Sequence, residues 1–244
     1  LGIVFDELEQ YEESIKYYNL SLKLKRDLEG DFRNTIDNTL NNIADSYRRS
    51  GQHDLAIKRY NEILENKNLN KDRPDFYALV LDNYAHTLYL SGQKEKLPKL
   101  YMRALRISDS VSYEGYNSII INQHLAKFYH DRNRKDSALY YAYRAKKISE
   151  KYHNDDLLKS LLLLSEIEEA SMASRHLKAY IKLSDSLQKK ERAIRNKFAR
   201  IRFETNQIEK ENIEIAKERL WLLIISVVVI IASFRPRYDL SGLQ

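Results

Sequence analysis

The sequence contains no cysteine, only three prolines and only six glycines in 244 residues. Without cysteine the chain cannot form a disulfide framework, use a thiol as a nucleophile or build a Cys-type zinc site. Glycine and proline interrupt regular structure most strongly, and no proline occurs between Pro98 and Pro236. The scarcity of both therefore predicts long helices rather than many short strands.

Motifs of the common enzyme classes are also missing. The sequence has no glycine-rich loop for phosphate, no Gly-x-Ser-x-Gly turn for a nucleophilic serine and no His-Glu-x-x-His zinc motif. Pairs of carboxylates do occur, but 35 acidic residues on helices produce such pairs by chance. We therefore expect that this chain is not an enzyme and that it binds no metal and no cofactor.

The net charge of +6 is unevenly distributed along the chain. Between Lys189 and Arg202 there are seven basic residues and one acid, Glu191. A basic block of this kind can bind the phosphates of nucleic acid. Here it is interleaved with isoleucines at heptad spacing and belongs to no recognisable nucleic-acid-binding fold. We therefore expect that this chain binds no nucleic acid.

An internal repeat organises the first three quarters of the chain. Each copy has a large apolar residue, a small residue directly after it and a second large residue three positions further on. The copies begin at Leu1, Ile43, Tyr84 and Leu125, which are 42, 41 and 41 residues apart. A second helical face follows each copy, with offsets of four and three residues: Ser14-Tyr18-Ser21, Ala56-Tyr60-Ile63, Leu97-Tyr101-Ala104 and Ala138-Ala142-Ala145.

The two faces of a copy are joined where a tight turn between helices is required. Gly51 and Gly92 fall at this point in the second and third copies, and glycine permits the backbone that such a turn needs. Pro74 stands where the next helix should begin, a position that tolerates proline. The spacing thus predicts pairs of helices repeated along the chain.

These residues resemble the tetratricopeptide repeat, in which small residues stand where two helices cross closely and Tyr or Phe fills the gaps. The resemblance covers residues 1–182 as four to five repeats, and it implies an all-α solenoid, a tetratricopeptide-repeat superhelix. The period of 41 to 42 residues exceeds the usual period of about 34, which implies longer helices or connections. The first repeat lacks its start, so we expect the chain to be a fragment or a processed product.

In this family the first helices of the repeats line a concave groove that binds a protein or peptide. Asn42 and Asn83 occupy equivalent places, and an amide can both donate to and accept from a peptide backbone. The alternatives are that these residues are merely solvated, or that the histidines form a metal or pH-sensing cluster. Carried onto this register, the resemblance places eight residues in the groove: Asn42, Asp45, Arg49, Asn83, His86, His124, Lys127 and His130.

A different rhythm begins after Leu183. It predicts a long charged amphipathic helix over residues 183–219, with apolar residues seven apart. A second apolar stripe is poorly developed, so the helix resembles a coiled coil without completing one. Such a stripe is buried most simply against a second copy, which predicts a homodimer; the alternative is that it folds back onto the last repeat. The stripe consists of Leu187, Ile194, Ile201, Ile208 and Ile215.

The segment 220–234 contains 15 residues and no charge. At about 1.5 Å per residue it would extend roughly 22 Å, against a hydrocarbon core of about 30 Å. Because it is apolar on every side and Trp221 stands at its edge, we expect a transmembrane helix in contact with the lipid bilayer, with a short tail at 235–244. The alternative is a buried core helix.

The order of these segments resembles a group of bacterial membrane-anchored sensor proteins, in which a repeat array precedes a membrane span and an output module follows it. The resemblance rests on Asp185-Ser186-Leu187, on residues 197–205 and on the charged helix that leads to the apolar segment. It implies a bacterial inner-membrane protein with periplasmic repeats and a role in signal transduction. The alternative is the truncated sensor region of a histidine kinase or of a membrane-linked transcription regulator with a helix-turn-helix module.

Overall fold

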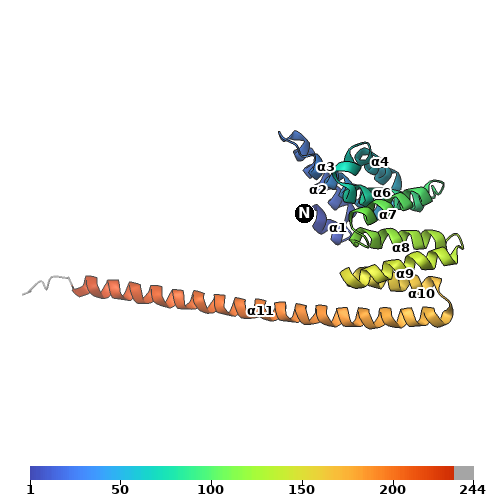
Figure 1. The fold of residues 1–244 in the computed structure, drawn as a ribbon. Helices are drawn as coiled ribbons and strands as arrows, with labels where there is room; N and C mark the ends of the chain where they lie inside the picture. The colour runs from blue at the N-terminus through green and yellow to red at the C-terminus, as the bar shows by residue number, and fades with distance from the viewer. Residues whose placement is uncertain (234–244) are drawn as a thin grey trace, which may run out of the picture. The chain divides into compact units, whose positions relative to one another are not determined.

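The computed structural model describes residues 1–233, and every regular element in this range is a helix (Figure 1). The expected tail at 235–244 lies outside the described residues. The helices are α1 (Gly2–Glu7), α2 (Tyr11–Asp27), α3 (Arg33–Arg49), α4 (His53–Leu64), α5 (Leu69–Asp72), α6 (Pro74–Leu90), α7 (Leu97–Val111), α8 (Tyr116–His130), α9 (Lys135–Tyr152), α10 (Asn154–Ile167) and α11 (Ala170–Ser233).

Most of these helices form antiparallel pairs, which Figure 1 shows as stacked hairpins from blue to yellow. Repeat one consists of α1 and α2, repeat two of α3 and α4, repeat three of α6 and α7, and repeat four of α8 and α9. Among the first helices, α3 also lies against α6, and α6 lies against α8. The expected all-α solenoid of helix pairs is therefore confirmed.

The turn inside each pair has the same backbone geometry in all four repeats. Its central residue has a positive φ, at 58° for Glu9, 79° for Gly51, 81° for Gly92 and 55° for Asn133. The next residue donates its N–H to a carbonyl five positions earlier, as from Gln52 to the Tyr47 oxygen at 2.8 Å. This contact satisfies a carbonyl that the end of a helix leaves free. Glycine removes the steric cost at two of the four turns.

The core lies between the two helices of each pair and between neighbouring pairs. Ala44, Ala85 and Ala126, at equivalent places on the first helices, are completely buried. Small side chains let the helices approach, and larger ones such as Tyr60 and Tyr101 fill the space between them. The small and large residues that recur in the sequence are therefore the residues that pack between the helices.

Helix α11 runs without interruption from Ala170 to Ser233. The chain divides into two compact units, Leu1–Ser184 and Asp185–Gln244, so the first part of α11 belongs with the repeats. In the second unit the side chains of Ile194, Ile201 and Ile208 are all about half exposed, at 54%, 46% and 58%. This unit therefore presents an apolar stripe that no other part of the described unit covers.

The prediction of a transmembrane helix at 220–234 is wrong. Within residues 1–233 no helix is both long enough and apolar enough to cross a membrane. The physical reason is length, since the uncharged run is preceded directly by Lys217, Glu218 and Arg219 in the same helix. Extending the run toward the roughly 20 residues of a spanning helix therefore brings charges into it. The predicted inner-membrane localisation with periplasmic repeats depended on this helix and is withdrawn with it.

Candidate functional site

The eight residues predicted to bind a peptide lie on the first helices of three successive repeats. Helix α3 carries Asn42, Asp45 and Arg49, α6 carries Asn83 and His86, and α8 carries His124, Lys127 and His130. We call the surface that they occupy the first-helix face. Because α3 contacts α6 and α6 contacts α8, the three groups are neighbours in space.

Several of these side chains bind residues of the adjacent repeat. The Asn83 amide donates to the Asn41 side-chain oxygen at 3.4 Å, and the Arg49 guanidinium donates to Asp6 at 2.7 Å. Asp45 accepts from the Nε of Arg48 at 3.1 Å and forms an ion pair with the same guanidinium. Arg49 and Asn83 therefore join neighbouring repeats as well as lining the first-helix face, whereas the contact of Asp45 stays within α3.

The two histidines of the prediction are in direct contact. The rings of His86 and His124 are stacked with centroids 3.8 Å apart and planes 8° from parallel. The Nδ1 of His124 lies 2.9 Å from a carboxylate oxygen of Asp82, which is 1% exposed as a side chain. Asp82 thus anchors His124, and His124 in turn covers one face of His86.

Burial and neighbouring basic groups keep His86 neutral. Burial lowers the pKa of His86 strongly, and the proximity of His124, Arg48 and His53 lowers it further. The Nδ1 atom of His86 is buried and has no hydrogen-bond partner among the described residues. Protonation would therefore place an unpaired charge beside His124.

The alternative of a histidine metal site lacks a sufficient ligand set. No group of three or more His, Asp or Glu side chains in residues 1–233 is arranged to hold a metal ion. His130 lies at the end of α8 and takes no part in the stacked pair. The structure thus brings two of the three histidines together and leaves the third apart.

The remaining side chains of the first-helix face are available to a partner. Asn42 lines a pocket of about 470 Å³ between α1, α2 and α3, together with Tyr18, Leu24 and Thr39. Lys127 is exposed and lies 3.5 Å from Asp131, the residue that follows α8. Surface ion pairs of this kind are weak, so the ammonium group can exchange Asp131 for a partner's carboxylate.

A second set of polar residues on the first helices was not predicted. Asn41, Asp82 and Gln123 recur 41 residues apart, each one place before a predicted residue. Asn41 and Asp82 bind the next first helix as described above, and the Gln123 amide donates to Ser160 at 2.9 Å. We call these three residues the polar ladder. Their regular spacing on helices with apolar neighbours was the available sequence signal.

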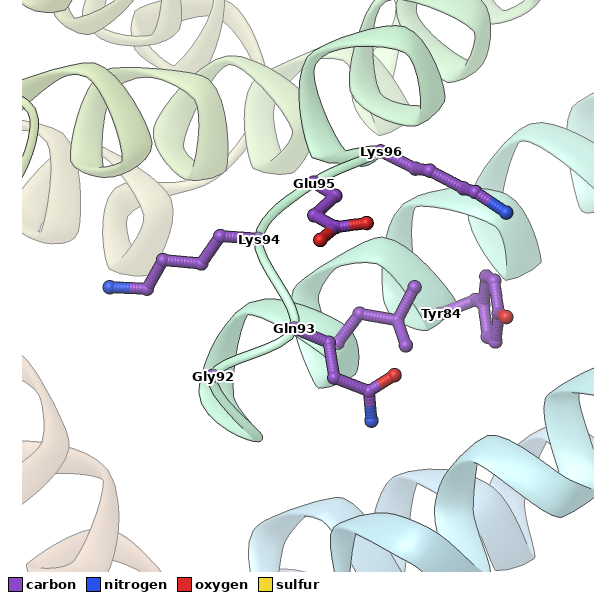
Figure 2. A pocket seen from close by; sticks show the side chains of 7 residues that line it. Tyr84, Gly92, Gln93, Lys94, Glu95 and Lys96 are labelled. Atoms are coloured by element: carbon purple, nitrogen blue, oxygen red, sulfur yellow. The ribbon is translucent and has the colours of Figure 1, made fainter.

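A further pocket of about 440 Å³ lies at the turn between α6 and α7 (Figure 2). Tyr84 and Leu88 of α6 form one side, and the loop from Gly92 to Lys96 forms the other. In Figure 2 the side chains of Lys94 and Lys96 extend in opposite directions from this loop, so they do not converge on one point. The pocket therefore lacks the converging polar groups of an active site.

Comparison with known proteins agrees with this geometry. Residues 1–68 match a family model described as tetratricopeptide repeat. This first part of the chain is therefore similar to the tetratricopeptide repeat. The fold of the chain is similar to that of BtubC (BKLC) from P. vanneervenii, with a TM-score of 0.62, 17% identity and coverage of 77% of this chain and 78% of that one.

A second solved structure extends the likeness. It is a form of a putative kinesin light chain from Podosopora anserina with nearly identical TPR-like repeats. The TM-score is 0.59 at 14% identity, over 78% of this chain and 93% of that chain. At such identities the likeness concerns the fold alone.

Two curated proteins are similar in sequence to part of this chain. The anaphase-promoting complex subunit CDC16 of Saccharomyces cerevisiae is 23% identical over 155 residues, which cover 58% of this chain and 18% of that protein. The response regulator aspartate phosphatase H of Bacillus subtilis is 26% identical over 118 residues, covering 48% of this chain and 30% of that protein. The chain thus spans less than a third of the length of either relative.

Proposed function

We propose that this tetratricopeptide-repeat protein binds an extended segment of a partner protein on its first-helix face. The observation that carries the proposal is the regular placement of polar side chains on three neighbouring helices. Asn42 and Asn83 offer amides 41 residues apart in the sequence, and Lys127 adds a cation on the third helix. Such an array presents donors and acceptors along a line, which suits the repeating groups of a peptide backbone.

The contacts between the predicted residues determine which of them can bind. The Asn42 side chain lines its pocket, whereas Asn83 must exchange a long contact of 3.4 Å with Asn41. The Arg49 and Asp45 side chains are held by shorter contacts, so we assign them to positioning rather than to binding. His86 is buried against His124 and contributes shape rather than a hydrogen bond.

The test uses a peptide selected from a displayed random library against the full chain, labelled with fluorescein and titrated by fluorescence anisotropy. Replacement of both Asn42 and Asn83 by Ala should weaken its binding about thirtyfold, since each lost hydrogen bond contributes roughly 1 kcal/mol. Asn61→Ala is the matched control, because Asn61 is exposed on the second helix α4. Equal affinities for the double variant and the control would refute the proposal.

We also propose that two copies of the chain associate through the second unit. The exposed isoleucines of the second unit form one stripe at heptad spacing, and a second copy of this helix can cover them. The partner stripe is weak, with Lys190, Lys197 and Glu204 three residues after successive stripe positions, so the association should be of modest affinity. A pair of this strength would suit a module that changes its association when a ligand binds.

A role in bacterial signalling is supported by resemblance and by the similarity to the Bacillus subtilis response regulator aspartate phosphatase H. The alternative, a truncated sensor region of a histidine kinase or of a helix-turn-helix regulator, is distinguished by reading the coding sequence beyond Gln244. A phosphoacceptor histidine segment with a nucleotide-binding domain supports the kinase, and a terminal DNA-binding domain supports the regulator. That this chain itself is not an enzyme stays a prediction.

A further inference from the structure

The second helices of repeats three and four form a groove of their own. Helices α7 and α9 are joined by the Tyr141 hydroxyl, which donates to the Met102 sulfur at 3.3 Å, and by Arg144, which donates to Asp109 at 2.6 Å. Two adjoining hollows of about 300 and 410 Å³ share Met102 and Arg106 as lining residues. We call this surface the α7–α9 groove.

One wall of the groove carries positive charge that nothing in the described chain neutralises. Lys99, Arg103 and Arg106 are all exposed and lie on one face of α7, at offsets of four and three residues. None of the three forms an ion pair within residues 1–233. The nearby carboxylate of Asp109 is already paired with Arg144. The wall therefore attracts anions.

The floor of the groove is apolar. Met102 is 37% exposed in the middle of the three cations, and Tyr140 on α9 is 63% exposed. The Tyr140 ring meets that of Tyr141 edge to face, with centroids 5.0 Å apart. Exposed aromatic and methionine side chains flanked by charges are typical of binding surfaces rather than of ordinary solvated helices.

We propose that the α7–α9 groove binds an acidic segment of a partner protein with one large apolar side chain between its carboxylates. The apolar side chain would lie against Met102 and Tyr140, and the carboxylates would pair with Lys99 and Arg106. These two cations are separated along α7 by about 10 Å, the length of about three residues of extended chain. The groove thus selects carboxylates on either side of the apolar residue.

This site is separate from the first-helix face, because it is built on the second helices of its repeats. Both can be occupied at once, and variants on one should leave the other unaffected. A single-stranded nucleic acid would also bring negative charge. Such ligands are usually held by successive aromatic residues on which the bases stack, whereas this groove exposes Tyr140 with only the edge of Tyr141 beside it. The peptide is therefore the ligand that fits.

The probe is a fluorescein-labelled peptide of alternating Glu and Gly residues with one central Trp, titrated into the full chain by anisotropy. A peptide with Gln in place of Glu and a peptide with Ser in place of Trp are its matched controls. We expect the acidic Trp peptide to bind at least about tenfold more tightly than either control, and its binding to weaken with salt.

The variants locate the site. Arg106→Glu should weaken binding of the acidic Trp peptide about tenfold, since it replaces an attraction by a repulsion. Lys23→Glu, which reverses another exposed cation on the second helix of repeat one, should leave binding unchanged. Tyr140→Ala should weaken binding of the Trp peptide and leave the Ser peptide unchanged. Circular dichroism checks that the variants keep the helical content of the parent chain.

Three results would overturn the proposal. One is equal binding by the Arg106→Glu and Lys23→Glu variants. Another is tighter binding of a thymidine oligonucleotide that displaces the peptide, which would make the groove a nucleic-acid site. The third is loss of peptide binding in the Asn42 and Asn83 double variant but not in Arg106→Glu, which would move the acidic peptide to the first-helix face.

Discussion

The stacked pair of His86 and His124 makes the stability of the repeats depend on pH. In the unfolded chain His86 titrates near pH 6.5, the ordinary value for histidine. In the folded protein burial lowers the pKa of His86, with His124 and Arg48 lowering it further. Below about pH 6.5, His86 therefore binds a proton in the unfolded state but not in the folded state. Stability is complete above this pH and decreases as the pH falls.

The size of the effect follows from proton linkage. One proton bound only by the unfolded state costs about 1.4 kcal/mol of unfolding free energy per pH unit below 6.5. Between pH 7 and pH 5 the loss due to His86 should therefore reach about 2 kcal/mol. This is a large part of the roughly 5–15 kcal/mol that holds a typical domain folded.

The assay is urea unfolding followed by circular dichroism at pH 7, 6 and 5, for the parent chain and two variants. His86→Phe keeps an aromatic ring against His124 but cannot take a proton, and His86→Gln removes both the ring and the titratable group. Both variants should gain about 2 kcal/mol relative to the parent between pH 7 and pH 5, whatever their stability at pH 7. If all three chains lost stability in parallel, the buried neutral histidine would not be the cause.

Three further outcomes are expected. Ala56→Trp overpacks a completely buried crossing in repeat two and should cost about 1–3 kcal/mol, seen as a lower urea midpoint; an unchanged midpoint would contradict the register. Tyr101→Phe removes a buried hydroxyl with no partner among the described residues, so the melting temperature should stay equal or rise, and a clear decrease would show that the hydroxyl is satisfied. In the proposed dimer, Cys at Ile201 should form disulfides between copies, whereas Cys at Lys210, on the opposite side of the helix, should not; equal yields would exclude the stripe as the interface.

The repeat could be predicted from the sequence because the residues that recur at its period are the ones that pack in its core. A small residue at Ala44, Ala85 and Ala126 is required wherever two helices cross, so burial leaves a mark every 41 residues. The glycine turns were readable for a similar reason. The matching turns at Glu9 and Asn133 were not, because neither residue type by itself demands a positive φ.

The candidate site was only partly readable. Helical spacing correctly placed Asn83, His86 and His124 on the first helices, but spacing within one helix says nothing of the distance between two helices. The first helices lie close enough for side chains 42 positions apart to meet, so Asn83 contacts Asn41 and His124 contacts Asp82. Some of the side chains predicted to bind a ligand, Asn83 and His124, therefore bind residues of the neighbouring repeat instead.

The mistaken transmembrane helix had a different origin. An uncharged run is not sufficient for a spanning helix, and the length of this one, roughly 22 Å, is less than the bilayer core of about 30 Å. The charges at Lys217, Glu218 and Arg219 directly before it set that length. Apolar residues on every side indicate that a helix avoids water. They do not make a 15-residue run long enough to cross a bilayer.

The polar ladder also has a consequence for how the chain folds. The contacts from Asn41 to Asn83 and from Asp82 to His124 both close loops of 42 residues, and the contact from Gln123 to Ser160 closes one of 37. Loops of nearly equal length carry nearly equal entropic costs of closure. No junction between repeats is then favoured by chain length as the place where folding begins. The order in which the repeats assemble is left to local helix stability, and the array can grow from its centre in both directions.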